Sequence, residues 1–170
     1  APSDGPSRDG PAVDVPPATV LQEYFRPGAP MDARMRFAGS EAPALAPTLV
    51  YPEDGTIIPG NLDGLEVHFR RGTSGDLFQV SFRGDVGVVH VYASCEAAGD
   101  GCAVPIPTDQ LREISRAAGP GERVQITVRA SDGTNVGAST SRSIGIVQEE
   151  FRGGVYYWAA NPGSIMRYEF

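Results

Sequence analysis

The stretch Leu77 to Cys102, LFQVSFRGDVGVVHVYASCEAAGDGC, decides the fold because it holds two strand patterns, a turn and both cysteines. From Leu77 to Arg83, apolar and polar residues alternate, which predicts a strand with one buried face. Gly84 and Asp85 form a turn signal, and the following apolar, β-branched run predicts a second, more buried strand. We expect a central β-hairpin whose second strand directs Val89, Val91, Ala93 and Cys95 toward the core, with Val88, His90 and Tyr92 facing outward or lying under a neighbouring element.

The two cysteines, Cys95 and Cys102, flank a short glycine-containing tip and favour a disulfide-closed loop. The chain-entropy estimate for an eight-residue loop is about 2.5 kcal/mol of stabilisation. A metal pair and two free thiols are the alternatives, but zinc takes four ligands and the chain has only two histidines. A disulfide places the protein outside the cytosol, in an extracellular, periplasmic or outer cell-surface location.

Composition narrows the class of protein further. A net charge of −7 argues against nucleic-acid binding, and no run of 18 apolar residues predicts a membrane span. The chain contains 21 Gly and 15 Pro, which indicates many turns and few long helices. It contains no Lys, so Schiff-base chemistry is excluded.

Residues 1–44 are rich in proline and predict an extended or disordered tether. In a secreted bacterial protein such a tether often spaces a domain from a lipid anchor. Residues 19–25 break the pattern, because Val20, Leu21, Tyr24 and Phe25 have the spacing of a short helical face. We expect this segment to dock on the domain, or to bind a partner through Tyr24 and Phe25.

Residues 45–150 predict an antiparallel β-sandwich with one short helix, because short alternating segments follow one another with frequent turns. The helix is expected over Thr108 to Ala118, with Thr108 as N-cap and Gly119-Pro120 as its end. Ala103 to Ile106 is expected to be at most a short edge strand. Gly137 to Gln148 is expected to be one long polar edge strand.

The pattern Pro47-Thr-Leu-Val-Tyr-Pro-Glu-Asp-Gly-Thr56 resembles the first strand of bacterial immunoglobulin-like or fibronectin type III-like modules. The resemblance covers residues 45–150 and implies an adhesive, structural or assembly role. The two cysteines are too close together for the inter-sheet bridge of a true immunoglobulin domain, so a looser member of the sandwich class is favoured.

Residues 151–170 predict an aromatic β-hairpin with a Pro-Gly turn. The segments Gly-Gly-Val-Tyr-Tyr-Trp158 and Ser164-Ile-Met-Arg-Tyr-Glu-Phe resemble the entry to a TolB-like β-propeller, which implies a longer secreted polypeptide. Tyr156, Tyr157 and Trp158 are candidate contacts for a partner or a sugar. Alternation is expected to bury about half of them in core or interface packing.

No catalytic motif is present, and both histidines lie on predicted strands facing outward, so we do not expect an enzyme. Calcium is the metal that the turn aspartates would favour, with Asp100 and Asp132 as weak candidates and no other cofactor expected. The sequence therefore predicts a non-catalytic extracellular module with a structural, adhesive or assembly role, whose partner is another protein or the rest of its polypeptide. A carbohydrate-binding module attached to an enzyme or a propeller is the alternative.

Overall fold

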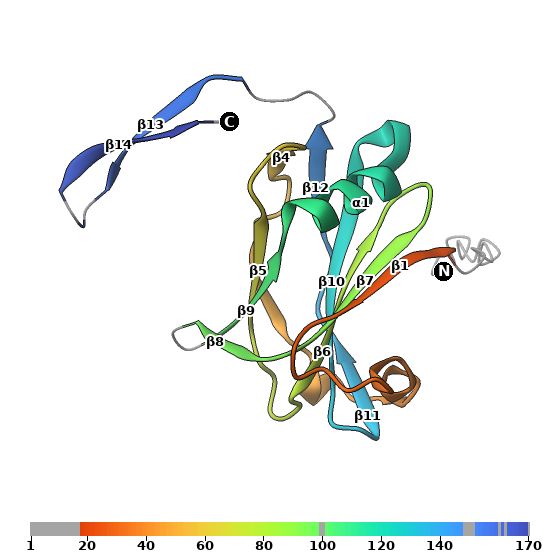
Figure 1. The fold of residues 1–170 in the computed structure, drawn as a ribbon. Helices are drawn as coiled ribbons and strands as arrows, with labels where there is room; N and C mark the ends of the chain where they lie inside the picture. Colours follow the sequence, from red (N-terminus) through yellow and green to blue (C-terminus); the bar gives the residue numbers. More distant parts are fainter. Residues whose placement is uncertain (1–17, 99–100, 148–151, 160, 162, 170) are drawn as a thin grey trace, which may run out of the picture.

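Two β-sheets packed face to face form the body of the protein in a computed structural model that describes residues 18–98, 101–147, 152–159, 161 and 163–169 (Figure 1). The large sheet has the order β1-β7-β6-β10-β11-β2, and β12 and β4 branch from β10. The small sheet has the order β3-β5-β9-β8. Most strand pairs are antiparallel, so the predicted all-β sandwich is confirmed. The strands of the large sheet are β1 (Val20–Phe25), β2 (Ser40–Glu41), β4 (Ile57–Pro59), β6 (Leu77–Arg83), β7 (Val88–Ser94), β10 (Arg123–Ser131), β11 (Asn135–Ala138) and β12 (Arg142–Val147), and those of the small sheet are β3 (Thr48–Tyr51), β5 (Leu65–Arg70), β8 (Glu96–Ala98) and β9 (Gly101–Ile106).

The core lies between the two sheets and follows the alternation of the sequence. In β6 the side chains of Phe78, Val80 and Phe82 are fully buried, and β7 pairs with β6 in the antiparallel register of a hairpin. Phe69 of the small sheet meets Phe78 of the large sheet with ring centroids 4.8 Å apart. Local alternation therefore predicted the central hairpin and its buried face correctly.

The helix α1 (Thr108–Ala118) begins and ends where the sequence predicted. It packs Leu111, Ile114 and Ala118 against the core. Thr108 is not the N-cap, however. That position belongs to Pro107, whose carbonyl accepts the first helical hydrogen bond from Leu111, while the Thr108 hydroxyl points toward Leu62 and Asp63 instead.

The expected helical turn at residues 19–25 is wrong, because these residues form β1. The strand β1 runs parallel to β7, with Val20 opposite Val88 and Phe25 opposite Tyr92. A short isolated helical turn is only marginally stable in water, whereas the edge of β7 presents unpaired backbone groups to which an added strand can hydrogen-bond. The segment therefore does dock on the sandwich, but as an added strand.

Two expectations about edge strands are also wrong. The strand β9 is internal, because β8 folds back along it on the side opposite β5. The single strand expected over 137–148 is divided into β11 and β12, which both pair with β10. Ser139 marks the break by exchanging hydrogen bonds with the backbone of Val128 through its amide and its hydroxyl. The strands β2 and β4 then lie outside β11 and β12.

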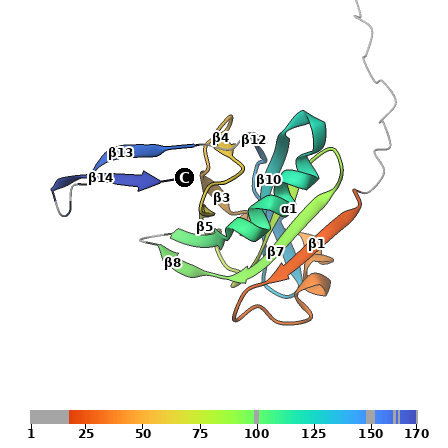
Figure 2. The same ribbon diagram turned by 45° about the horizontal axis from the view of Figure 1, so that its top comes forward.

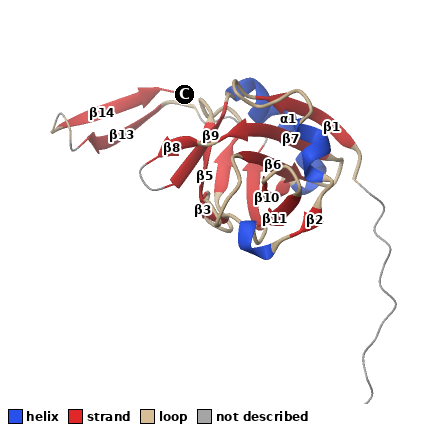
Figure 3. Ribbon diagram, turned by 90° about the horizontal axis from the view of Figure 1, so that it is seen from below, coloured by secondary structure: helices blue, strands red, loops and turns tan. Residues whose placement is uncertain are grey.

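Three short 3₁₀ segments complete the body: η1 (Ala33–Phe37), η2 (Pro43–Leu45) and η3 (Gly119–Gly121). Figure 3 shows β2 beside β11. Ala33 and Phe37 of η1 pack with Leu77, Tyr92 and Val136 in a second apolar cluster.

The C-terminal hairpin is confirmed as strands β13 (Gly154–Ala159) and β14 (Ser164–Glu169). Gly163 has a φ of +76°, and its amide donates a hydrogen bond to the carbonyl of Ala159, which closes the connection. Figures 1 and 2 show that the hairpin projects away from the two packed sheets. It pairs only with itself among the strands of the described chain.

Candidate functional site

The hairpin β13–β14 presents large apolar side chains to solvent on both of its faces. Directly opposed residues share a face in an antiparallel pair, so Tyr156 and Trp158 lie on one face with Ile165. Val155, Tyr157 and Met166 lie on the other face. The expectation that about half of the aromatic residues would be buried is wrong: Tyr156 is 65% exposed, Tyr157 50% and Trp158 67%.

The face that carries Tyr156 and Trp158 also carries the charged groups of the hairpin. The guanidinium of Arg167 lies 5.5 Å from the centre of the Tyr156 ring and forms an ion pair with Glu169. A cation over the face of an exposed ring contributes about 0.5–1 kcal/mol. Tyr156, Trp158 and Ile165 share this face, and we call the exposed apolar surface that they form the aromatic face.

The other aromatic candidates, Tyr24 and Phe25, belong to the packing of the sandwich. Tyr24 packs partly buried against the main core, and burial raises the pKa of its hydroxyl. The Phe25 ring stacks on Tyr92 with centroids 4.9 Å apart and remains 39% exposed. Both residues therefore hold β1 in place, and only part of Phe25 is available to a partner.

A polar network that the sequence analysis missed lies beneath the N-terminal segment. The Tyr92 hydroxyl donates to Glu23 at 2.8 Å and accepts from the Gln79 amide at 3.0 Å. Arg129 donates to the Gln79 side chain at 3.0 Å and to the Phe37 carbonyl at 2.8 Å. Burial, followed by the hydrogen bond with Glu23, raises the pKa of Tyr92 to about 12. The outward polar positions of β6, β7 and β10 were the signal that could have indicated this network.

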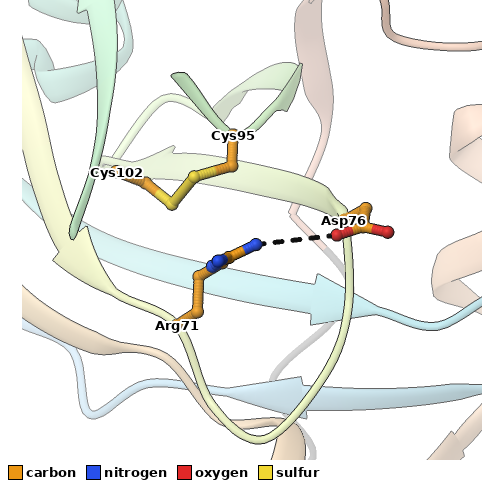
Figure 4. The surroundings of a disulfide bond; sticks show 4 residues. All are labelled: Arg71, Asp76, Cys95 and Cys102. Carbon is orange, nitrogen blue, oxygen red and sulfur yellow. Dashed lines mark ion pairs between the residues drawn. A yellow bond between two sulfur atoms is a disulfide. The ribbon is translucent and has the colours of Figure 1, made fainter. Parts of the chain in front are cut away.

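The cysteine pair forms the predicted disulfide between Cys95 and Cys102. Cys102 is buried in the core, and the bridge ties the start of the β8–β9 hairpin to its second strand. Figure 4 shows the ion pair of Arg71 and Asp76 beside the bridge, with 3.7 Å between NH1 and Oδ1. Because Asp76 is almost fully exposed, this pair adds little stability. The role of the disulfide is therefore structural.

The carboxylate of Asp132 accepts hydrogen bonds from residues of its own turn. It accepts hydrogen bonds from the amides of Thr134 at 2.8 Å and Asn135 at 2.7 Å, and from the Asn135 side chain at 3.2 Å. These bonds lower the pKa of Asp132, the backbone bond from Asn135 most of all. Asp100 lies outside the described residues. In the part of the chain that the structure describes, no group of three His, Cys, Asp or Glu side chains is arranged to hold a metal ion.

The two histidines lie on different sheets. His90 of the large sheet is half-buried with Nδ1 2.9 Å from the Ser81 hydroxyl, and burial lowers its pKa. His68 of the small sheet is hydrogen-bonded through Nε2 to Glu66 at 2.8 Å and meets the ring edge of Tyr51. Each histidine thus has a cross-strand or same-strand partner, as expected for histidines on strands.

Two hollows accompany these features on the surface. A cavity of about 560 Å³ lies among turns at one end of the sandwich, with Asp76, Ser94 and Asp132 in its lining. A second, of about 470 Å³, lies on the outer side of the small sheet and is lined by Tyr51, Leu62, Gly64, Leu65, Glu66 and His68. Both volumes are within the range of ligand sites.

Neither a scan against protein-family models nor a search of curated proteins found a match to this chain. Among the described residues, no helix is long and apolar enough to cross a membrane.

Proposed function

We propose that this chain is a non-catalytic extracellular β-sandwich module that serves assembly, with the hairpin β13–β14 as its contact surface. One observation carries the proposal: the hairpin exposes six large apolar side chains on its two faces. A two-stranded hairpin is marginally stable alone in water, and contiguous exposed apolar surface is typical of an interaction site.

The disulfide supports the extracellular part of the proposal, because such bridges persist in oxidising compartments. The resemblance to immunoglobulin-like and fibronectin type III-like modules has support from the position of β3, which begins within the Pro47–Thr56 pattern and is followed by a turn at Gly55. In this proposal the partner is another protein or a further part of the same polypeptide, such as the blade of a propeller. The proline-rich composition of residues 1–17 suits a surface-anchored chain.

Photo-crosslinking in the producing cells tests this role. A photoreactive phenylalanine analogue replaces Ile165 on the aromatic face of the hairpin, which is 69% exposed, and the matched control carries it at Met35, which is 75% exposed on the sandwich body. We expect a discrete protein adduct from position 165 and none from position 35. Equal labelling from both positions, or no adduct from either, overturns the proposal.

The second candidate function is carbohydrate binding, which the aromatic face favours because Tyr156 and Trp158 share that face and are both mostly exposed. Stacking on such rings is a common way to hold the apolar side of a sugar. Glycan-array binding that is lost in Trp158→Ala, together with no protein adduct from position 165, would favour this function over assembly.

A further inference from the structure

The outer side of the small sheet has a surface that matches the aromatic face of the hairpin. His68 and Glu66 of β5 stand opposite Ala103 and Pro105 of β9, and the ring of Tyr51 lies against His68. We call the surface formed by Tyr51, Glu66, His68, Ala103 and Pro105 the receiving face. Tyr51 is 42% exposed, and the Glu66 side chain is 60% exposed, so the surface is open to solvent.

The two surfaces complement each other in size. The aromatic face carries large side chains, whereas Ala103 and Pro105 are small and Gly64 at the margin has no side chain. The hollow of about 470 Å³ beside Tyr51 has room for an aromatic ring. The strands β5, β9, β13 and β14 each have six residues, so a hairpin laid over the receiving face would cover its length.

Charge selects the orientation of this contact. Glu66 brings a carboxylate to the receiving face, and Arg167 brings a guanidinium that remains 53% exposed to the aromatic face. Each chain has a net charge of −7, so two copies repel each other at long range and need apolar burial with a local opposite-charge pair to associate.

We propose that the aromatic face of one copy packs on the receiving face of a second copy, and that the second copy returns the same contact. This inference rests on the proposed assembly role of the hairpin and names its partner. An aromatic side chain buries about 150–250 Å² when it is covered. The three large side chains of each aromatic face are about two-thirds exposed, so each hairpin offers roughly 300–500 Å². An equal area on each receiving face brings a reciprocal dimer to roughly 1,200–2,000 Å², the size of a stable interface.

Sedimentation velocity over about 1–300 µM in 150 mM salt tests the inference on the full chain. We expect a concentration-dependent dimer that Tyr156→Ala weakens at least ten-fold. Tyr157→Ala is the matched control, because it removes the same side chain from the opposite face and leaves the dimer unchanged. The emission of Trp158, the single tryptophan, shifts to shorter wavelength as the dimer forms.

A complementation experiment identifies the receiving face. Tyr51→Ala weakens the dimer at least ten-fold by itself. In an equimolar mixture with Trp158→Ala, the heterodimer keeps one of the two reciprocal contacts intact, because the unchanged hairpin of one variant meets the unchanged receiving face of the other. If Tyr51→Ala does not fold, Glu66→Arg, which changes an exposed residue, replaces it in the experiment. Glu66→Arg should weaken the dimer, and mixing it with Arg167→Glu should restore dimer formation.

Three results overturn the inference: a monomer at every concentration, equal effects of Tyr156→Ala and Tyr157→Ala, or a dimer that is insensitive to both Tyr51→Ala and Glu66→Arg. A monomer whose Trp158 is already shielded would mean that the hairpin packs on its own sandwich, which also overturns it. Any of these results leaves the assembly role standing if position 165 still crosslinks to a different protein. Loss of that adduct as well removes both.

Discussion

At the scale of single residues, Tyr92 connects the N-terminal segment to the large sheet. Its ring stacks on Phe25 and meets Phe37, and its hydroxyl bridges Glu23 and Gln79. Buried polar groups cost free energy when they lose their partners, so this hydroxyl stabilises the segment only while it remains protonated.

Tyr92 gives the protein a stability loss at high pH. Its pKa is raised from 10.0 to about 12 in the folded state, so its contribution is complete below pH 10 and declines as the pH rises toward 12. The chain has no lysine, so no lysine ammonium group contributes to the pH dependence in this interval. Tyr92→Phe should lower the free energy of unfolding at pH 8 by about 1–2 kcal/mol and reduce its decline between pH 10 and 12.

Denaturant titrations at pH 8, 10 and 11 measure both effects of Tyr92→Phe. The matched control is Tyr157→Phe, since Tyr157 is exposed on the hairpin and has no such network. An identical pH dependence in the wild type and Tyr92→Phe would contradict the role assigned to this hydroxyl.

At the scale of elements, the approach of α1 to the β6–β7 connection depends on one glycine. A Cβ atom at Gly84 would lie 2.1 Å from the carbonyl oxygen of Ala117 and 2.5 Å from the Cα of Ala118. The helix backbone therefore passes over a position that only hydrogen can fill. The sequence marked Gly84 as a turn residue, but its closest constraint comes from a segment more than thirty residues later.

Gly84→Ala should lower the free energy of unfolding by about 1–3 kcal/mol, because either the helix or the turn must move. Gly145→Ala is the control, since its nearest neighbour would be the Ile57 side chain at 3.5 Å, an ordinary contact. Thermal unfolding followed by circular dichroism compares the two variants. A Gly84→Ala protein as stable as the control would show that α1 adjusts without cost.

At the scale of the whole molecule, the hairpin and the sandwich are expected to unfold independently when the chain is monomeric. The strands β13 and β14 hydrogen-bond to each other, whereas the sandwich has its own core between two sheets. Removing residues 152–170 should therefore change the melting temperature of the sandwich by no more than about 2 °C at 1 µM.

Calorimetry of the truncated chain and of the 170-residue chain at low and high concentration separates the contribution of the hairpin from that of association. At 300 µM the full chain should melt at a higher temperature than at 1 µM, because association stabilises the folded state, and the truncated chain should show no such dependence. A large fall on truncation at 1 µM would contradict the independence of the hairpin.

The sequence by itself determined the features that depend on neighbouring residues. Alternation predicted the buried face of β6 and of β10, the spacing of Leu111 and Ile114 predicted α1, and the distance between Cys95 and Cys102 predicted the bridge. The period of side chains along a strand or helix and the closure of a short loop depend on neighbouring residues, so the sequence alone is enough to predict them.

Only the tertiary structure decided which strands became neighbours and which surfaces stayed uncovered. The spacing of Tyr24 and Phe25 predicts a helix, but in the structure this segment forms a ladder of hydrogen bonds with β7. The strand β9 is internal because β8 pairs with its second edge. Successive aromatic residues of the hairpin point to opposite faces, yet both faces are exposed, because burial requires an opposing surface and the described chain places none there. Pairing and burial depend on segments distant in sequence, and no local pattern encodes them.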